Sequence, residues 1–163
     1  MAKVEDNNIK AAIRILTSEE KLAADSDVTY AKLLERHPAA PANHCLPHNM
    51  TAIQMSEAEV QKTIFSFPAG SSGGPDGIRP QHILDLINCR ECGTVLLTSY
   101  TGFVNTLLNG KCHPEVAPVL FGGNLIALEK KSGGIRPIAI GYTWRRITAE
   151  CANAYATSSS PVT

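Results

Sequence analysis

Apolar residues recur at intervals of three and four along most of the first 110 residues, a spacing that predicts helices. The first two runs consist of Ile9, Ile13 and Leu16, and then of Tyr30, Leu33 and Leu34. We expect a helix over each run, the second one starting at Ser26 or Asp27 and burying its three apolar side chains. Three prolines interrupt the pattern between residues 37 and 47. Because proline fixes φ and lacks an N–H group, this segment is predicted to be a loop or linker.

Stronger helical signals follow the linker. Residues 56–59 (SEAE) form a capping-box pattern, and an apolar face continues behind it. Pro80 suits the first position of another helix. The clearest apolar stripe consists of Leu97, Tyr100, Val104, Leu107 and Leu108, and it ends at Asn109 and Gly110. We expect this helix to lie in the core and interpret Tyr100 and Phe103 as packing residues. The folded unit is predicted to begin after the linker.

The period changes near residue 125. In residues 125–140 (LIALEKKSGGIRPIAI), apolar segments flank a serine and two glycines, which predicts two short strands joined by a turn. Trp144, Ile147, Cys151 and Tyr155 then predict a last helix, with Arg145 and Arg146 on or near its other face. The expected fold class is α+β, with a mainly helical N-terminal part, a two-stranded hairpin and a short final helix.

Charge is distributed unevenly along a chain whose net charge is zero. A zero net charge argues against a polycation that coats nucleic acid along its whole length. Residues 1–110 carry nine basic and twelve acidic side chains, whereas residues 111–163 carry six basic and three acidic ones. The positive charge therefore lies at the hairpin end, where it favours weak and salt-sensitive binding of phosphate.

Lys130, Lys131 and Arg136 flank the predicted turn of the hairpin. Arginine can bind a phosphate through two parallel hydrogen bonds, and lysine binds it as a point charge. The alternative is a surface hairpin whose charges interact only with water, as most exposed charges do. The order of the residues around the turn favours phosphate binding.

A glycine-rich block precedes the helix that starts at Pro80. It consists of Gly73, Gly74, Pro75, Asp76, Gly77 and Ile78. This composition predicts a tight turn that leaves backbone N–H groups free to face a phosphate or a sugar. It is not the phosphate-binding loop of nucleoside triphosphatases, because G-x-x-x-x-G-K-[ST] does not occur in it. By itself, the block is typical of an ordinary turn.

The residue order around the hairpin closely resembles the fingers hairpin of reverse transcriptases from retrotransposons that lack long terminal repeats. In that family, L-I-A-L-x-K-K-x-G-G-I-R-P-I-A-x-G is followed by R-R, which here is Arg145 and Arg146. Residues 66–80 (SFPAGSSGGPDGIRP) resemble the S-A-G-G-P-D-G-I loop that precedes the fingers of the same enzymes. Residues 103–110 and 118–123 also resemble the corresponding segments of these enzymes. The resemblance therefore covers about residues 56–156 in several blocks of the right order.

The resemblance implies a role for each block. Lys130, Lys131 and Arg136 would hold the incoming nucleoside triphosphate, and the loop of residues 73–78 would lie against the template. Which of the two lysines makes the main contact stays open. We divide the chain into a helical extension with a proline-rich linker (1–50), a fingers-like portion (51–156) and a disordered tail (157–163). Without the chain that supports the fingers in intact relatives, residues 122–156 are expected to be poorly ordered.

The catalytic residues of the family do not occur in this sequence. Intact relatives use paired aspartates downstream of the fingers to hold Mg²⁺ ions for a two-metal polymerase mechanism. Here the 78 residues after Asp85 contain no aspartate, and Y-x-D-D occurs nowhere. We therefore expect a truncated copy with no catalytic residues and no cofactor of its own.

Five cysteines and no recognisable secretory signal predict free thiols and an intracellular protein, nuclear or cytoplasmic. Cys89 and Cys92 have the spacing of half a zinc site, and Cys112 and His113 are the nearest further ligands. Neighbouring residues rarely bind one metal together without strain, and no second C-x-x-C occurs. A metal site is therefore not expected, and a zinc-dependent adaptor is the least favoured function.

Taken together, the sequence predicts a reverse transcriptase fragment that has no polymerase activity alone. The alternative is a non-catalytic module, derived from a retrotransposon, that binds RNA or a protein. The expected partners are an RNA or DNA template, bound weakly, and the palm portion of a polymerase. No apolar stretch reaches the ~20 residues of a membrane-spanning helix, so no membrane partner is expected.

Overall fold

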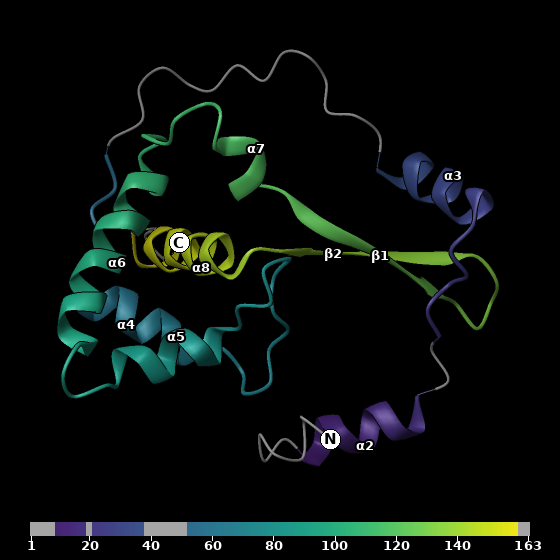
Figure 1. The fold of residues 1–163 in the computed structure, drawn as a ribbon, viewed down its shortest axis with the longest axis horizontal. Coiled ribbons are helices and arrows are strands. Elements are labelled where there is room, and N and C mark those ends of the chain that lie inside the picture. Colours follow the sequence, from purple (N-terminus) through teal and green to yellow (C-terminus); the bar gives the residue numbers. More distant parts are fainter. Residues whose placement is uncertain (1–8, 19–20, 38–51, 160–163) are drawn as a thin grey trace.

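The computed structural model describes residues 9–18, 21–37 and 52–159. Helices and one pair of strands follow one another along the chain (Figure 1). In order they are α2 (Ile9–Thr17), α3 (Asp27–Arg36), α4 (Glu57–Ser66), α5 (Pro80–Ile87), α6 (Gly93–Leu108), α7 (Ala117–Leu120), β1 (Gly123–Glu129), β2 (Ile135–Gly141) and α8 (Thr143–Ser159). The predicted α+β class is confirmed.

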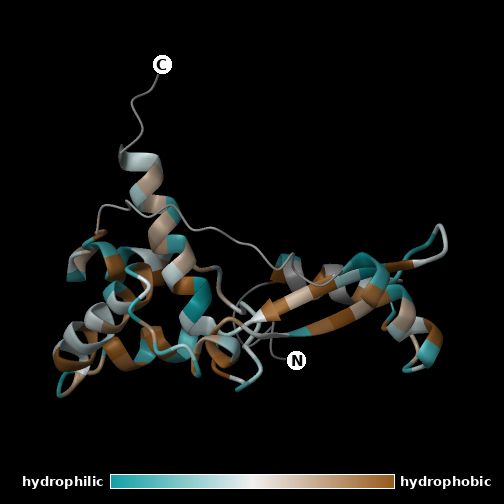
Figure 2. Cartoon of the chain, turned by 90° about the horizontal axis from the view of Figure 1, so that it is seen from above, coloured by the Kyte–Doolittle hydropathy of each residue, from teal (hydrophilic) through white to brown (hydrophobic). Residues whose placement is uncertain are grey.

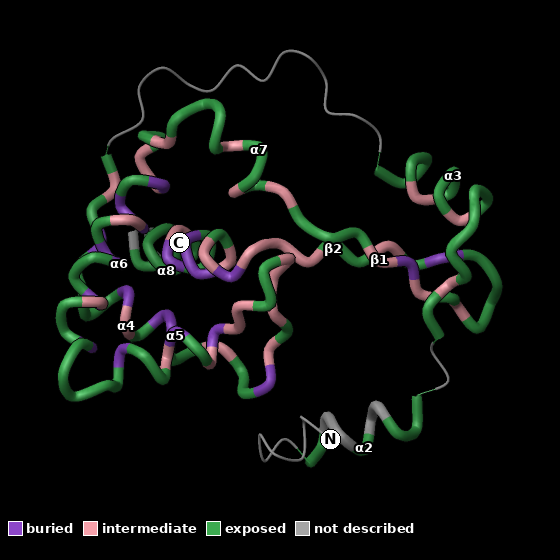
Figure 3. Tube along the Cα trace, in the orientation of Figure 1, coloured by how far each residue is buried: buried purple, intermediate pink, exposed green. Residues whose placement is uncertain are grey.

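Helices α4, α5, α6 and α8 form one helical body around a shared core. Val60 and Ile64 of α4, Val104 of α6 and Ile147 of α8 are at most 1% exposed. Figure 3 shows the buried stretches gathered on these helices. Each helix contributes one apolar face, as the spacing of its residues predicted. The core therefore lies where the apolar faces of these helices meet.

The entry into α4 is fixed by two kinds of hydrogen bond. The predicted capping box is present, because the Glu59 backbone N–H donates to Ser56 Oγ and the Ser56 N–H donates to the Glu59 carboxylate. Asn105 of α6 receives the Met55 N–H at 2.8 Å and donates its amide to the Met55 carbonyl at 3.0 Å. Asn109 binds both backbone groups of Ile53 in the same way. Side chains at the end of α6 thus fix the segment that leads into α4.

β1 and β2 form an antiparallel hairpin that extends away from the helical body (Figures 1 and 2). The pairing runs from Gly123 opposite Gly141 at the base to Glu129 opposite Ile135 at the tip. The turn closes through the Lys130 N–H, which donates to the Gly134 carbonyl at 3.1 Å. Both turn glycines have a φ of +82°, a conformation that side chains other than glycine rarely adopt. The predicted hairpin and its glycine turn are confirmed.

The N-terminal part covers one face of this hairpin. Leu22 forms a β-bridge with Leu128, the Ala23 N–H donates to the Ala127 carbonyl, and α3 contacts β2. Ala127 and Ile135 project from the covered face and are 8% and 5% exposed. The hairpin is therefore supported by residues 21–36.

This arrangement corrects one prediction about the first helices. Helix α3 forms, with Ser26 as its N-cap, but Tyr30 and Leu34 are 63% and 53% exposed, so they are not buried. Helix α3 lies on a two-stranded hairpin, which is too narrow to cover three apolar side chains. Helix α2 also forms as predicted, and its residues Ile9 and Ile13 are exposed.

The predicted linker and the predicted tail are only partly described by the structure. Most of the predicted linker, from residue 38 on, lies outside the described residues. Helix α8 is 17 residues long and runs to Ser159, so the first residues of the predicted tail are helical. Ile147 and Cys151 of α8 belong to the core, and the expectation that residues 122–156 are poorly ordered stays a prediction. No helix among the described residues is long and apolar enough to cross a membrane.

Candidate functional site

The three basic residues predicted to bind phosphate lie together at the tip of the hairpin. Lys130 and Lys131 stand at its turn, and Arg136 pairs with Leu128 one position inside β2. Lys131 and Arg136 are exposed, and Lys130 is half-buried. A cavity of about 310 Å³ beside the turn is lined by Lys130 and by Lys32 of α3. The analysis of the sequence missed Lys32, because only the fold brings α3 to the hairpin.

The glycine-rich loop forms the tight turn that its sequence predicted. The Gly77 N–H donates to the Gly74 carbonyl at 2.9 Å, and the Gly74 N–H donates to the Ile78 carbonyl at 3.1 Å. Asp76 Oδ1 accepts the Ile78 N–H at 3.0 Å. These three amides donate within the loop and are not available to a phosphate, and for the remaining amides of the loop the expectation stays a prediction.

The loop docks on the start of α8, directly after the hairpin. Trp144 Nε1 donates to Asp76 Oδ2 at 3.3 Å, and the Thr143 hydroxyl donates to the Ile78 carbonyl. The backbones approach so closely that a Cβ placed on Gly74 would lie 2.7 Å from Tyr142 Cα. Glycine is thus needed at this position for contact between two segments far apart in the sequence.

The two halves of the predicted site lie at opposite ends of the hairpin. The basic residues are at the tip, and the loop contacts residues 142–146 beyond the base. Six residues of extended strand separate the two ends, which corresponds to about 20 Å. One phosphate group cannot contact both, so a ligand that uses both must be an extended chain or two molecules.

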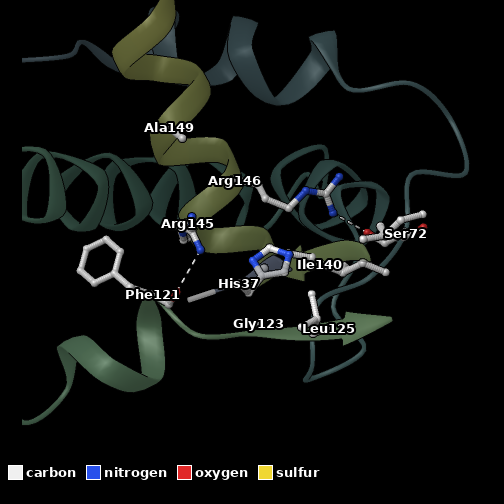
Figure 4. Close-up of a pocket in the computed structure, with 12 residues that line it drawn as sticks. His37, Ser72, Phe121, Gly123, Leu125, Ile140, Arg145, Arg146 and Ala149 are labelled. Carbon is white, nitrogen blue, oxygen red and sulfur yellow. Dashed lines mark hydrogen bonds between the residues drawn. The ribbon is translucent and has the colours of Figure 1, made fainter. Parts of the chain in front are cut away.

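A larger cavity of about 640 Å³ opens at the base of the hairpin, and we call it the base cavity (Figure 4). The strands contribute Gly123, Leu125 and residues 138–141 to its wall, and α8 contributes Arg145, Arg146 and Ala149. No role was predicted from the sequence for either arginine. The signal in the sequence was the R-R pair behind the hairpin, but its orientation depends on the fold.

The aromatic residues of the body form a cluster. The ring centroids of Tyr100 and Trp144 are 5.4 Å apart, and those of Phe103 and Trp144 are 6.2 Å apart. Burial raises the pKa of the Tyr100 phenol, and its hydroxyl has no hydrogen-bond partner among the described residues. An apolar cavity of about 370 Å³ beside the cluster is also lined by Leu96 and Leu120. Tyr100 and Phe103 therefore pack against Trp144, as the sequence predicted.

Cys89 and Cys92 lie in the connection between α5 and α6 and are both exposed. The pKa of the Cys89 thiol is lowered, mainly by the backbone N–H of Cys92, while a hydrogen bond with Cys89 raises the pKa of the Cys92 thiol. Within the described ranges, no three His, Cys, Asp or Glu side chains lie close enough to hold a metal ion. Neither Cys112 nor His113 completes a zinc site with this pair.

Comparisons with known proteins add no assignment, because no family model, curated protein or solved structure matches this chain.

Proposed function

We propose that residues 51–156 form a fingers portion like that of reverse transcriptases from retrotransposons lacking long terminal repeats. The observation that carries this proposal is the contact between its two most specific blocks. The glycine-rich loop and the segment behind the hairpin are 68 residues apart at Asp76 and Trp144, yet they form one interface. The blocks of the resemblance thus act as one structural unit.

In this proposal, the tip of the hairpin holds phosphate groups. Arg136 offers a planar fork for two hydrogen bonds, and Lys130 and Lys131 supply compact charges beside it. The loop of residues 73–78 would contact a template through its exposed residues, Asp76 and Gly77, since the amides of Gly74, Gly77 and Ile78 already donate within the loop. The hairpin would then hold a nucleoside triphosphate while the loop guides the template.

The chain alone is proposed to lack polymerase activity. A two-metal mechanism needs paired carboxylates, but the Asp76 carboxylate accepts from Ile78 and Trp144, and that of Asp85 accepts from Gln81. The test incubates the purified chain with a primed RNA, deoxynucleotides and Mg²⁺ or Mn²⁺. We expect no extended primer. Extension above a blank purified in the same way would overturn this part of the proposal.

The phosphate-binding role has its own test. We replace Lys130, Lys131 and Arg136 together by Glu and measure binding of a short oligouridylate over a range of salt concentrations. The expected result is weaker binding and a slope of log affinity against log salt that falls by about 2, since each contact on a single strand contributes about 0.7.

A matched control changes the same amount of charge elsewhere. Lys62, Arg90 and Lys111 are exposed and belong to the helical body or its connections, away from the hairpin. Replacing these three by Glu should reduce binding much less than the hairpin variant does. Equal affinities of wild type and the hairpin variant would mean that the basic tip is only a hydrated surface.

A second candidate function is a non-catalytic module that binds a protein. The observation that favours it is the apolar cavity beside Tyr100, Phe103 and Trp144, which offers a partner almost no polar groups. If the wild-type chain binds no oligouridylate even at low salt, this second function is preferred. Replacing Leu120 at the rim of that cavity by Glu would then be expected to prevent partner binding.

A further inference from the structure

We propose that the base cavity is a second phosphate site, which binds one nucleotide of a single-stranded nucleic acid through Arg145 and Arg146. The residues involved are different from those at the tip of the hairpin. The proposal therefore concerns a different site from the tip of the hairpin, and its tests do not depend on whether the tip binds phosphate.

The fold holds both arginines in place at the cavity. Consecutive residues of a helix point about 100° apart, so two neighbouring side chains rarely line one cavity. Here Arg145 Nη1 donates to the Phe121 carbonyl at 2.9 Å and Arg146 Nη1 donates to the Ser72 carbonyl at 2.6 Å (Figure 4). The Arg146 guanidinium also lies 5.6 Å from the centre of the Phe67 ring. Each guanidinium is thus oriented before any ligand arrives.

These bonds leave most of the donors available. A guanidinium has five N–H groups, and one hydrogen bond of each arginine to a carbonyl is described above. A carbonyl acceptor is neutral, so neither bond removes the positive charge. Two oriented guanidinium groups at one cavity are a suitable arrangement for phosphate, which they can bind through paired hydrogen bonds.

The positive charge at the base cavity is not neutralised by its own wall. No Asp or Glu lines the cavity, and no carboxylate pairs with Arg145 or Arg146 among the residues that the structure describes. The first turn of α8, which carries both arginines, also contains no acidic residue. The start of a helix carries a partial positive charge, which adds to the charge of the two arginines. An anion is the ligand that this electrostatic environment favours.

Several other residues of the wall are apolar and suit the other parts of a nucleotide, while His37 and Ser72 add polar groups. Leu125, Ile140 and Phe121 also line the cavity, and Gly123 and Gly141 add no side chains. A volume of about 640 Å³ lies within the range of small-ligand sites, about 300 to 1,000 Å³. Phosphate at the arginines and a base on the apolar wall would fill it.

A nucleic acid strand fits better than a free nucleotide. Arg145 is exposed and Arg146 is only half-buried, so water weakens a single phosphate contact. A strand also reaches further cations on the same molecule, and its contacts add through counterion release. The base cavity is continuous with the loop at Ser72, whose carbonyl orients Arg146. We therefore place a single strand along the base of the hairpin.

The first experiment removes both charges in the whole 163-residue chain. In the double variant Arg145→Gln and Arg146→Gln, affinity for a short oligouridylate at low salt should fall about tenfold, and the salt slope should fall by about 1.4. The thermal midpoint is measured in parallel, because loss of the bonds to Phe121 and Ser72 can loosen the fold.

A second set of variants keeps both arginines and their bonds. Ala149 is exposed on α8 and lines the base cavity, so its replacement changes the charge there with little strain. Ala149→Glu should weaken oligouridylate binding several-fold to about tenfold, and Ala149→Lys should strengthen it, by the Coulomb interaction with a phosphate nearby. The matched control is Ala58→Glu, the same change at an exposed position of α4, which should leave binding unchanged.

The outcomes separate the two phosphate sites and the two sources of the nucleotide. Equal binding by the wild type and by both sets of base variants overturns the inference, whatever the hairpin-tip variant does. Binding lost in the base variants but not in the tip variant supports the base cavity and overturns the role of the tip. Competition with uridine monophosphate identifies the source: if it binds as tightly as the oligomer, the strand is the wrong ligand and the inference fails in that form.

Hydrogen exchange places the bound strand directly. Protection on adding oligouridylate is expected in residues 121–125 and 139–146, the two segments that contain most of the residues lining the base cavity. Protection restricted to residues 129–136 would show that the strand binds at the tip alone, and would also overturn the inference.

Discussion

The helical body and the hairpin bury their apolar side chains in different ways. In the body, α4, α6 and α8 bury each other's apolar faces, and several side chains are completely enclosed. In the hairpin, Leu125 and Ile138 are still 39% and 36% exposed, and the two buried side chains are covered by residues 21–36. A two-stranded hairpin alone is marginal in water, so its order depends on that cover. We therefore expect the helical body to be more stable than the hairpin.

The largest expected difference between the two regions concerns one isoleucine in each, Ile147, which is buried in the body, and Ile138, which is partly exposed in the hairpin. Ile147→Ala in α8 should lower the free energy of unfolding by about 2 to 5 kcal/mol, because the fully buried side chain leaves a cavity. Ile138→Ala in β2 should cost less than about 1 kcal/mol, because that side chain is already partly in water. Urea denaturation followed by circular dichroism measures both. Similar losses would mean that the hairpin belongs to the same core.

The contact between the loop and α8 tests how the two regions are joined. Gly74→Ala should destabilise the fold by about 1 to 3 kcal/mol, since its Cβ would collide with the backbone at Tyr142. Gly102→Ala is the control, because its Cβ would meet nothing within 4 Å in the exposed face of α6. That control should stabilise the protein by about 0.5 to 1 kcal/mol. A neutral Gly74→Ala would show that the loop can leave α8 freely.

The cover of the hairpin is tested at its edge. Ala23→Pro removes the N–H that donates to the Ala127 carbonyl, and a lost hydrogen bond of this kind costs about 1 to 1.5 kcal/mol. Hydrogen exchange should then quicken in β1 but not in α6, whereas the control Ala24→Pro removes no described backbone bond. Even in the wild type, residues 123–141 should exchange faster than residues 95–108. Equal protection of the two segments would show that the hairpin is as stable as the body.

The smallest expected effect lies in the capping box of α4. Ser56→Ala should cost about 1 kcal/mol at neutral pH, which thermal unfolding measures. The Ser56 hydroxyl and N–H lower the pKa of the Glu59 carboxyl, so this contribution is present above the pKa of unfolded Glu and is lost as pH falls through the folded pKa. The gap between wild type and variant should therefore narrow in acid. A gap that stays constant would mean that the Glu59 charge contributes nothing.

Parts of the candidate site were predictable from the sequence for local reasons. The turn at residues 130–134 and the loop at residues 73–78 depend on glycine and proline, whose conformational preferences act within a few residues. The use of the loop amides was not predictable, because Asp76 Oδ1 accepts one of them and turns them inward. The contributions of Lys32 and of Arg145 with Arg146 depend on which segments meet in space. The spacing of residues along the chain does not show which distant segments come into contact.

The sequence alone determined the helices, the hairpin and the glycine turns of this protein, because periodicity and φ preferences are properties of neighbouring residues. It also determined most of the core, since the stripe of α6 has to be buried somewhere. The tertiary structure decided that α3 covers the hairpin and not the body, so Tyr30 and Leu34 stay exposed. It also decided that the R-R pair faces a cavity, through carbonyls 24 and 74 residues away in sequence. Such long-range contacts arise only when separate elements pack together.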